Sequence, residues 1–123
     1  MIRPATMLRL FLFLALALSP GGCTTVGGWF GDTEAETETL PVEDLYAMGK
    51  KELDEEDFEK AEKVFTRLVA RFPYGAISEQ AQLDLAFAQF KLAKYEEASS
   101  TVSRFIKMYP VSSQIDYAYY LKA

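Results

Sequence analysis

The chain has 123 residues and a formal net charge of −5, with no histidine and a single cysteine. This composition excludes a disulfide within the chain and a His/Cys metal cluster, and it removes histidine as a general base. The acidic balance argues against nucleic acid as a partner, because a negative surface repels phosphate. Carboxylates alone can support some chemistry, but we expect no catalytic residues, no metal and no cofactor.

The first 22 residues have the pattern of a secretory signal peptide. Arg3 and Arg9 precede an uncharged apolar run, Leu10 to Leu18, which is shorter than the roughly 20 residues needed to span a bilayer. A short anchor that is never cleaved is the alternative. Without residues 1–22 the chain holds 11 basic and 18 acidic residues, a net charge of −7. Anionic lipids do not attract such a body, so membrane attachment must have another source.

Cys23 follows this segment directly. The stretch 18–23 resembles the lipobox of bacterial lipoproteins, in which the cysteine becomes the acylated first residue. Two glycines precede the cysteine, as cleavage requires, but Pro20 stands where that family favours leucine. From this resemblance we predict a lipid anchor at Cys23. Two or more acyl chains would hold a soluble domain on a membrane stably. By the same resemblance, Thr24 in place of aspartate implies the outer membrane. The alternative is an ordinary cleaved signal with an incidental cysteine.

Residues 23–40 are expected to form the lipidated cysteine and a flexible tether. The run 33–39 consists mainly of threonine and glutamate, and the segment has little apolar material with which to offset the cost of ordering. Trp29 and Phe30 are exceptions. They could contact the membrane interface or dock on the folded body, and the sequence leaves both open.

The remaining residues, 41–123, repeat with a period of 37. Small residues, aromatic residues and prolines recur at equivalent places: Gly49 with Ala86, Phe58 with Tyr95, Ala61 with Ala98, and Pro73 with Pro110. A third copy begins near Gln114 and runs to Ala123. The spacing therefore predicts a domain of two repeats and part of a third.

Each copy is predicted to form a helical hairpin, because apolar residues recur at helical spacing on two successive segments. The expected helices are 42–55, 58–72, 78–92 and 95–109, with a further one from 114. Asp57 is expected to cap the second helix, and Pro73 and Gly75 to end it. Small residues such as Gly49 and Ala61 would let the paired helix backbones approach closely.

The recurring small, aromatic and proline positions resemble the tetratricopeptide repeat. The resemblance implies an all-α fold of helical hairpins stacked in a right-handed solenoid. The period of 37 departs from the usual value of about 34. The extra residues fall in the loop 74–78, and the tryptophan and tyrosine of the consensus first helix are missing.

A narrower resemblance is to the BamD (ComL) family, outer-membrane lipoproteins of the β-barrel assembly machinery. The stretches that carry it are 71–75, 80–86, 104–106 and 116–121. It covers roughly residues 40–123 and includes the lengthened loop. Members of the family carry more repeats than this chain, so a truncated, N-terminal fragment is expected. The implied partners are unfolded outer-membrane proteins and other subunits of the assembly machinery.

In such repeats the first helix of each pair lines a concave groove. Six residues are candidates for a peptide-binding surface there: Tyr46, Lys50, Phe87, Lys91, Tyr117 and Tyr120. Aromatic side chains would anchor an extended peptide, and lysines would bind its carboxylates. For Phe87 and Tyr120, packing in the core is an equal alternative.

The leading functional hypothesis is a barrel-assembly scaffold that recruits unfolded substrates at the periplasmic face of the outer membrane. One alternative is another tetratricopeptide lipoprotein of the envelope, such as a pilus or secretin assembly factor. Another is an accessory domain of a cell-wall enzyme whose catalytic part lies beyond residue 123. The carboxylates of Glu55, Glu56 and Glu96 are expected to be solvated or to favour helix starts rather than to act in acid–base chemistry.

Overall fold

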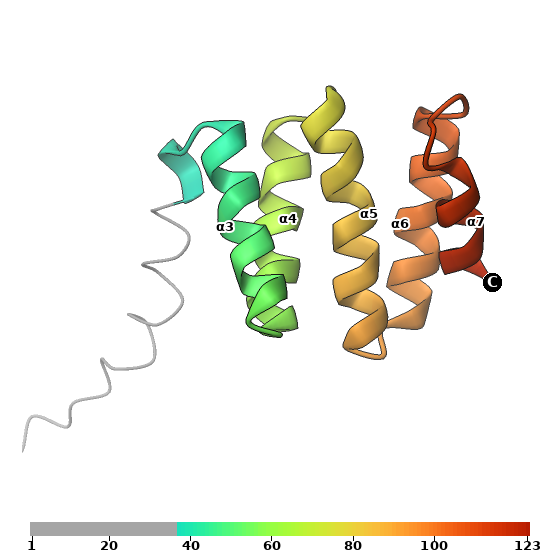
Figure 1. Ribbon diagram of the computed structural model, residues 1–123, viewed down its shortest axis with the longest axis horizontal. Helices are drawn as coiled ribbons and strands as arrows, with labels where there is room; N and C mark the ends of the chain where they lie inside the picture. Colours follow the sequence, from blue (N-terminus) through green and yellow to red (C-terminus); the bar gives the residue numbers. More distant parts are fainter. Residues whose placement is uncertain (1–36) are drawn as a thin grey trace, which may run out of the picture. The chain divides into compact units, whose positions relative to one another are not determined.

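The computed structural model describes residues 37–123, and this part of the chain contains helices and short loops but no strand. The helices are α3 (Val42–Asp54), α4 (Phe58–Arg71), α5 (Ala76–Lys91), α6 (Tyr95–Met108) and α7 (Ile115–Lys122) (Figure 1). The all-α prediction is confirmed. The predicted signal peptide, Cys23 and the tether as far as residue 36 lie outside the described residues. No helix in the described range is long and apolar enough to cross a membrane.

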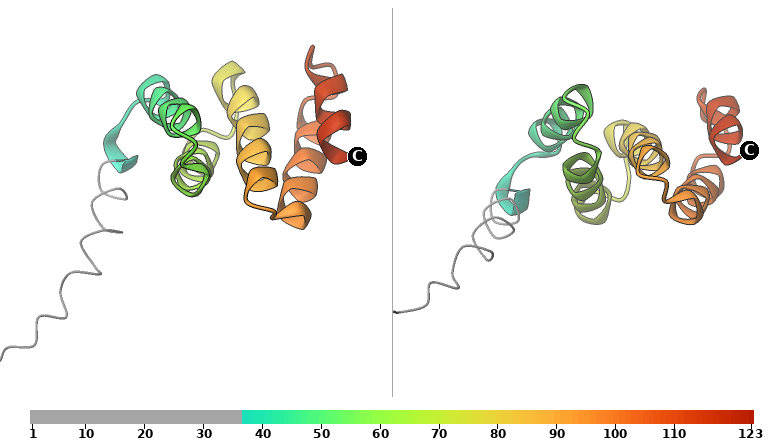
Figure 2. Two further views of the ribbon diagram at one scale, coloured as in Figure 1. Left: turned by 60° about the horizontal axis from the view of Figure 1, so that its bottom comes forward. Right: turned by 90° about the horizontal axis from the view of Figure 1, so that it is seen from below.

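Successive helices pack against one another, and the first helices of the pairs share one layer. The main contacts join α3 to α4, α4 to α5, α5 to α6 and α6 to α7. Further contacts join α3 to α5 and α5 to α7. The end-on view in Figure 2 shows α3, α5 and α7 on one side and α4 and α6 on the other. The first helices therefore form a common face, as a stack of hairpins requires.

The turns inside the two hairpins have the same backbone geometry. Glu56 and Ala93, which are 37 positions apart in the sequence, have φ angles of 59° and 60°. Their amides donate to the carbonyl oxygens of Leu53 and Phe90, both at 3.0 Å. Residues other than glycine rarely adopt this left-handed region. Its recurrence at equivalent positions confirms that the sequence period corresponds to a structural repeat.

The two copies begin their second helices differently. The Asp57 side chain accepts a hydrogen bond from the amide of Lys60 at 3.1 Å, which confirms the predicted N-cap of α4. Lys94 occupies the equivalent place before α6 and provides no such cap. Its ammonium instead lies 2.7 Å from the carboxylate of Glu62 on α4. This exposed ion pair joins the two hairpins but adds little stability.

Two apolar clusters hold the hairpins together, and α5 contributes to both. The first contains Leu45, Ala61, Val64, Phe65, Leu68, Ala81, Leu85 and Ala88, and the second contains Leu83, Ala86, Val102, Phe105 and Ala118. Helix α5 is consequently buried on nearly all sides, whereas the other helices bury one face. This burial includes polar side chains of the helix, Ser78, Gln82, Asp84 and Gln89, as well as its apolar ones.

In the first hairpin, Gly49 leaves room for the ring of Phe65 on α4. A Cβ atom at Gly49 would lie only 2.6 Å from Cε1 of Phe65 on α4. At the equivalent places of the second hairpin stand Ala86 and Val102, which share one cluster. The first hairpin thus combines glycine with phenylalanine at this contact, and the second hairpin combines alanine with valine.

Candidate functional site

The six predicted groove residues all lie on α3, α5 and α7, the helices that form the common face. The structure gathers them into two groups. Tyr46 and Lys50 surround a carboxylate near the middle of α5, whereas Phe87, Tyr117 and Tyr120 line a pocket nearer its C-terminal end. Lys91 lies beside the second group.

The carboxylate at the centre of the first group is Asp84, which the sequence reasoning missed. Asp84 is only 9% exposed. Its Oδ2 accepts a hydrogen bond from the hydroxyl of Tyr46 at 2.9 Å, and its Oδ1 lies 3.4 Å from Nε2 of Gln80 and 3.9 Å from Nζ of Lys50. A buried charge is tolerated only with such partners. The available signal was an acidic residue placed between two leucines, Leu83 and Leu85, in the middle of a predicted helix.

Tyr46 connects this polar group to the core. Its ring is partly buried and lies 6.0 Å from the ring of Phe65, centroid to centroid. Burial raises the pKa of the Tyr46 hydroxyl well above its ordinary value, and the hydrogen bond to the Asp84 carboxylate raises it further. The hydroxyl is therefore already engaged by the protein, and what Tyr46 offers a ligand is the exposed part of its ring.

The raised pKa of Tyr46 predicts a loss of stability at alkaline pH. In the unfolded chain the hydroxyl ionises near its ordinary pKa of 10.0, whereas in the folded chain it keeps its proton to higher pH. The contribution of the protonated Tyr46 hydroxyl to the free energy of unfolding is therefore complete below about pH 10, and it falls as the pH rises above that value. Urea unfolding of the Tyr46→Phe variant between about pH 8 and 11 should show a shallower decline than the wild type. The exposed Tyr74→Phe is the control, and parallel curves for Tyr46→Phe and wild type would contradict the assignment.

The second group forms an aromatic pocket of about 370 Å³. Its lining residues are Phe87, Phe90, Tyr117, Tyr120, Leu121 and Ala123. The rings of Tyr117 and Tyr120 stack with their centroids 6.4 Å apart, and Tyr120 is 76% exposed. Within the described residues, Tyr120 is therefore not part of either apolar cluster. Phe87 is only partly buried and meets the ring of Phe58 edge-on at 6.3 Å, so it both packs and lines the pocket.

Charged side chains lie near two residues of the aromatic pocket, Phe87 and Tyr117. The ammonium of Lys91 lies 5.7 Å from the ring centroid of Phe87 and 5.6 Å from that of Phe58, within the range of cation–π attraction. Burial raises the pKa of the Tyr117 hydroxyl, with a further contribution from the Asp84 carboxylate. The face thus offers an extended chain an aromatic pocket, a cation and a carboxylate held by neighbouring side chains.

Comparison with known proteins agrees with this architecture. The sequence model of the YfiO family, described as an outer membrane lipoprotein, matches residues 38–123. The chain belongs to this family. The match covers α3 to α7 and every candidate groove residue.

Several relatives of this YfiO-family chain are named outer membrane protein assembly factor BamD. The chain is 41% identical over 83 residues to the protein from Xylella fastidiosa strain 9a5c, a match that covers 68% of this chain and 28% of the relative. It is 33% identical over 116 residues to the protein from Neisseria meningitidis serogroup B, covering 94% and 43%. The Rickettsia prowazekii protein is 33% identical over 110 residues, covering 89% and 41%. The chain spans less than half the length of these relatives, and the predicted resemblance to the BamD family is confirmed.

Proposed function

We propose that this YfiO-family chain is a non-catalytic scaffold of outer-membrane protein assembly that binds unfolded barrel proteins on its α3–α5–α7 face. The relatives are named as outer membrane protein assembly factors, which supports outer-membrane protein assembly as the process in which the chain takes part. The aromatic pocket bordered by Phe87 and Tyr120 supports the mode of binding, because exposed aromatic side chains in a pocket are the usual anchors of peptide recognition. The single observation that carries the proposal is this pocket on the face shared by the first helices.

The chemistry of an unfolded barrel strand matches that face. Barrel strands alternate apolar and polar residues, so every second side chain of an extended segment points the same way. An apolar side chain would enter the aromatic pocket, and acidic groups beside it would meet Lys91. Asp84 and Lys50 lie further along α3 and α5, where polar atoms of the peptide would pass.

Replacing Tyr120 with alanine tests the pocket with little risk to the fold, because this side chain is 76% exposed. The probe is an amidated peptide of about ten residues, the length of a barrel strand, with alternating aromatic and polar residues. Its affinity for the full chain, measured by fluorescence anisotropy, should fall about tenfold in Tyr120→Ala. Tyr119→Ala is the matched control, since Tyr119 is exposed on the same helix but does not line the pocket. Equal losses in the two variants would refute the pocket as the binding site.

Affinity purification separates the proposed process from the two alternatives. The names of the relatives do not favour a pilus or secretin assembly factor or an accessory domain of a cell-wall enzyme. An outer-membrane assembly scaffold should be recovered together with the central barrel-forming subunit of the assembly machinery. Recovery of secretin or cell-wall enzymes without that subunit would favour the alternatives.

The membrane attachment that we propose is a lipid anchor at Cys23, which would hold the domain on the periplasmic face of the outer membrane. The cysteine follows the apolar signal directly, and the family is described as outer membrane lipoproteins. Cys23→Ser should move the protein from the membrane pellet to the soluble fraction, because the acyl chains account for the binding. Retention of Cys23→Ser in the pellet would rule the anchor out.

A further inference from the structure

The loops that connect successive hairpins lie together at one end of the stack. In Figure 1 the α4–α5 loop, the α6–α7 loop and the start of α3 are at the upper end, and the turns inside the hairpins are at the opposite end. The hydroxyl of Tyr109, which follows α6, donates to the carbonyl oxygen of Pro73 in the first loop at 3.3 Å. Ser112 in the second loop donates to the carboxylate of Glu79 in the first turn of α5. The two loops, residues 72–75 and 109–114, therefore form one surface, here called the loop end.

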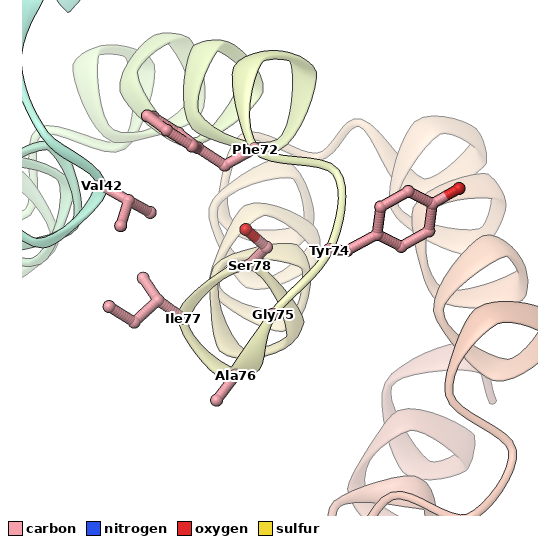
Figure 3. A pocket seen from close by; sticks show the side chains of 7 residues that line it. All are labelled: Val42, Phe72, Tyr74, Gly75, Ala76, Ile77 and Ser78. Carbon is pink, nitrogen blue, oxygen red and sulfur yellow. The ribbon is translucent and has the colours of Figure 1, made fainter.

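Each loop exposes a large apolar side chain at its tip. Tyr74 is 79% exposed and Val111 is 95% exposed, the highest values among the large apolar side chains of the described residues. They are 37 positions apart, at equivalent places of the two repeats, and each follows a proline. Figure 3 shows the ring of Tyr74 directed away from Val42 and Ile77. A single exposed apolar residue is normal on a folded domain, whereas a repeated one at the same end of the molecule indicates a contact surface.

Basic side chains border the loop end in the layer of α4 and α6. The stretch 63–78 contains three basic residues and no acidic one, and the stretch 98–115 contains two basic residues and no acidic one. The two in the second stretch are Arg104 and Lys107, which are exposed in the last two turns of α6. The apolar tips thus lie beside side chains of one sign of charge.

The negative net charge of the chain is distributed unevenly. The stretch 50–62, around the turn of the first hairpin, contains seven acidic and three basic residues. The acidic residues near the loop end belong to the first turns of α3, α5 and α7, in the layer opposite α4 and α6 (Figure 2): Glu43, Asp44, Glu79 and Asp116. A negatively charged surface is therefore repelled by the hairpin turns and attracted by the α4–α6 side of the loop end.

The described part of the chain also begins at the loop end. Thr37 is only 2% exposed, and its carbonyl oxygen accepts a hydrogen bond from the guanidinium of Arg71, the last residue of α4. Cys23 precedes Thr37 by 14 positions, which span at most roughly 50 Å when fully extended. The lipid anchor proposed at Cys23 would therefore keep the loop end at a high effective concentration near the membrane surface.

We propose that the loop end rests on the surface of an anionic phospholipid bilayer. Tyr74 and Val111 enter the interface between head groups and acyl chains, and Arg104 and Lys107 lie against the lipid phosphates. A nucleic acid would match the basic side chains but not the apolar tips. The contact is independent of the peptide groove and adds to the anchor. It sets the helices upright on the membrane, so that the α3–α5–α7 face remains open to a peptide.

A fluorescent label at the loop end tests this contact. In the Cys23→Ser background, Val111→Cys gives the full chain a single cysteine, which is labelled with the environment-sensitive dye NBD. The chain is reconstituted into phosphatidylcholine vesicles with increasing amounts of phosphatidylglycerol. Emission should shift to shorter wavelength as the anionic fraction rises, because the dye leaves water, and about 0.5 M salt should reverse the shift. The same dye on Tyr95→Cys, an exposed position at the start of α6, is the control and should not shift.

Charge variants of the labelled chain provide the second arm of the test. Arg104→Gln combined with Lys107→Gln should raise the phosphatidylglycerol fraction at half of the shift by about twofold or more, since each basic residue adds to the attraction. Lys51→Gln combined with Lys122→Gln changes the net charge equally, at exposed positions in the last turns of α3 and α7, and should leave this midpoint unchanged. Equal effects of the two double variants would overturn the proposal. So would an unshifted label at position 111 in anionic vesicles, or equal shifts of the labels at positions 111 and 95.

Discussion

Replacing Phe65 with alanine should lower the free energy of unfolding by about 3–5 kcal/mol, the range found for removing a buried phenylalanine. Phe65 is fully buried in the first cluster, which also contains Leu45 and Leu68. Its ring covers Gly49, which has no side chain to move into the space left behind. Because a site that cannot collapse keeps its cavity, we expect the upper part of the range.

Urea denaturation followed by circular dichroism measures this loss. Phe90→Ala is the control with the same chemical change, because Phe90 is 47% exposed and its removal leaves no enclosed cavity. It should cost less than about 1.5 kcal/mol, in proportion to its smaller buried area. Comparable losses in the two variants would show that the ring of Phe65 does not hold the first hairpin together in the way described.

Gly49→Ala should destabilise the chain even though alanine is the better helix former. The added methyl group would lie 2.6 Å from Cε1 of Phe65, so the buried ring or the helix must shift. Overpacking of this kind costs about 1–3 kcal/mol, and the gain in helix propensity returns about 1 kcal/mol. We expect a net loss of up to about 2 kcal/mol by urea denaturation.

A double-mutant cycle identifies the cause of that loss. In the background of Phe65→Leu the ring that opposes Gly49→Ala is absent, so the same change should become stabilising by up to about 1 kcal/mol. The second hairpin already uses such a combination, Ala86 with Val102. Ala47→Gly, at an exposed position of α3, measures the propensity contribution alone. If Gly49→Ala has the same effect in both backgrounds, contact with Phe65 is not the reason.

The helices of the described part were predictable because local sequence determines them. Apolar residues at helical spacing, the cap at Asp57 and the break at Pro73 and Gly75 act within a few residues. All boundaries agree with the prediction within about two residues, the range in which helix ends are commonly uncertain. The largest departure is at α5, which begins at Ala76 rather than at residue 78 because Gly75 turns the chain directly into the helix.

The candidate site was predictable only in part. The repeat placed the six groove residues on the correct helices, since equivalent positions of successive hairpins share a face. It did not show that Tyr46 would be bound to Asp84, 38 positions away, or that Phe90 would join the aromatic pocket. Such contacts depend on how far apart the hairpins lie and on the rotation of each helix.

By itself, the sequence determined the elements of this protein and their order, through periodicity, caps and breaks, and its repeats indicated the family. Only the tertiary structure decided which side chains meet between hairpins. It placed the Asp84 carboxylate under Tyr46, stacked Tyr117 on Tyr120 and left the hydroxyl of Ser78 without a partner beside an open helix end. The physical reason is that helix formation depends on neighbours within one turn, whereas packing depends on the shapes of surfaces distant in the chain.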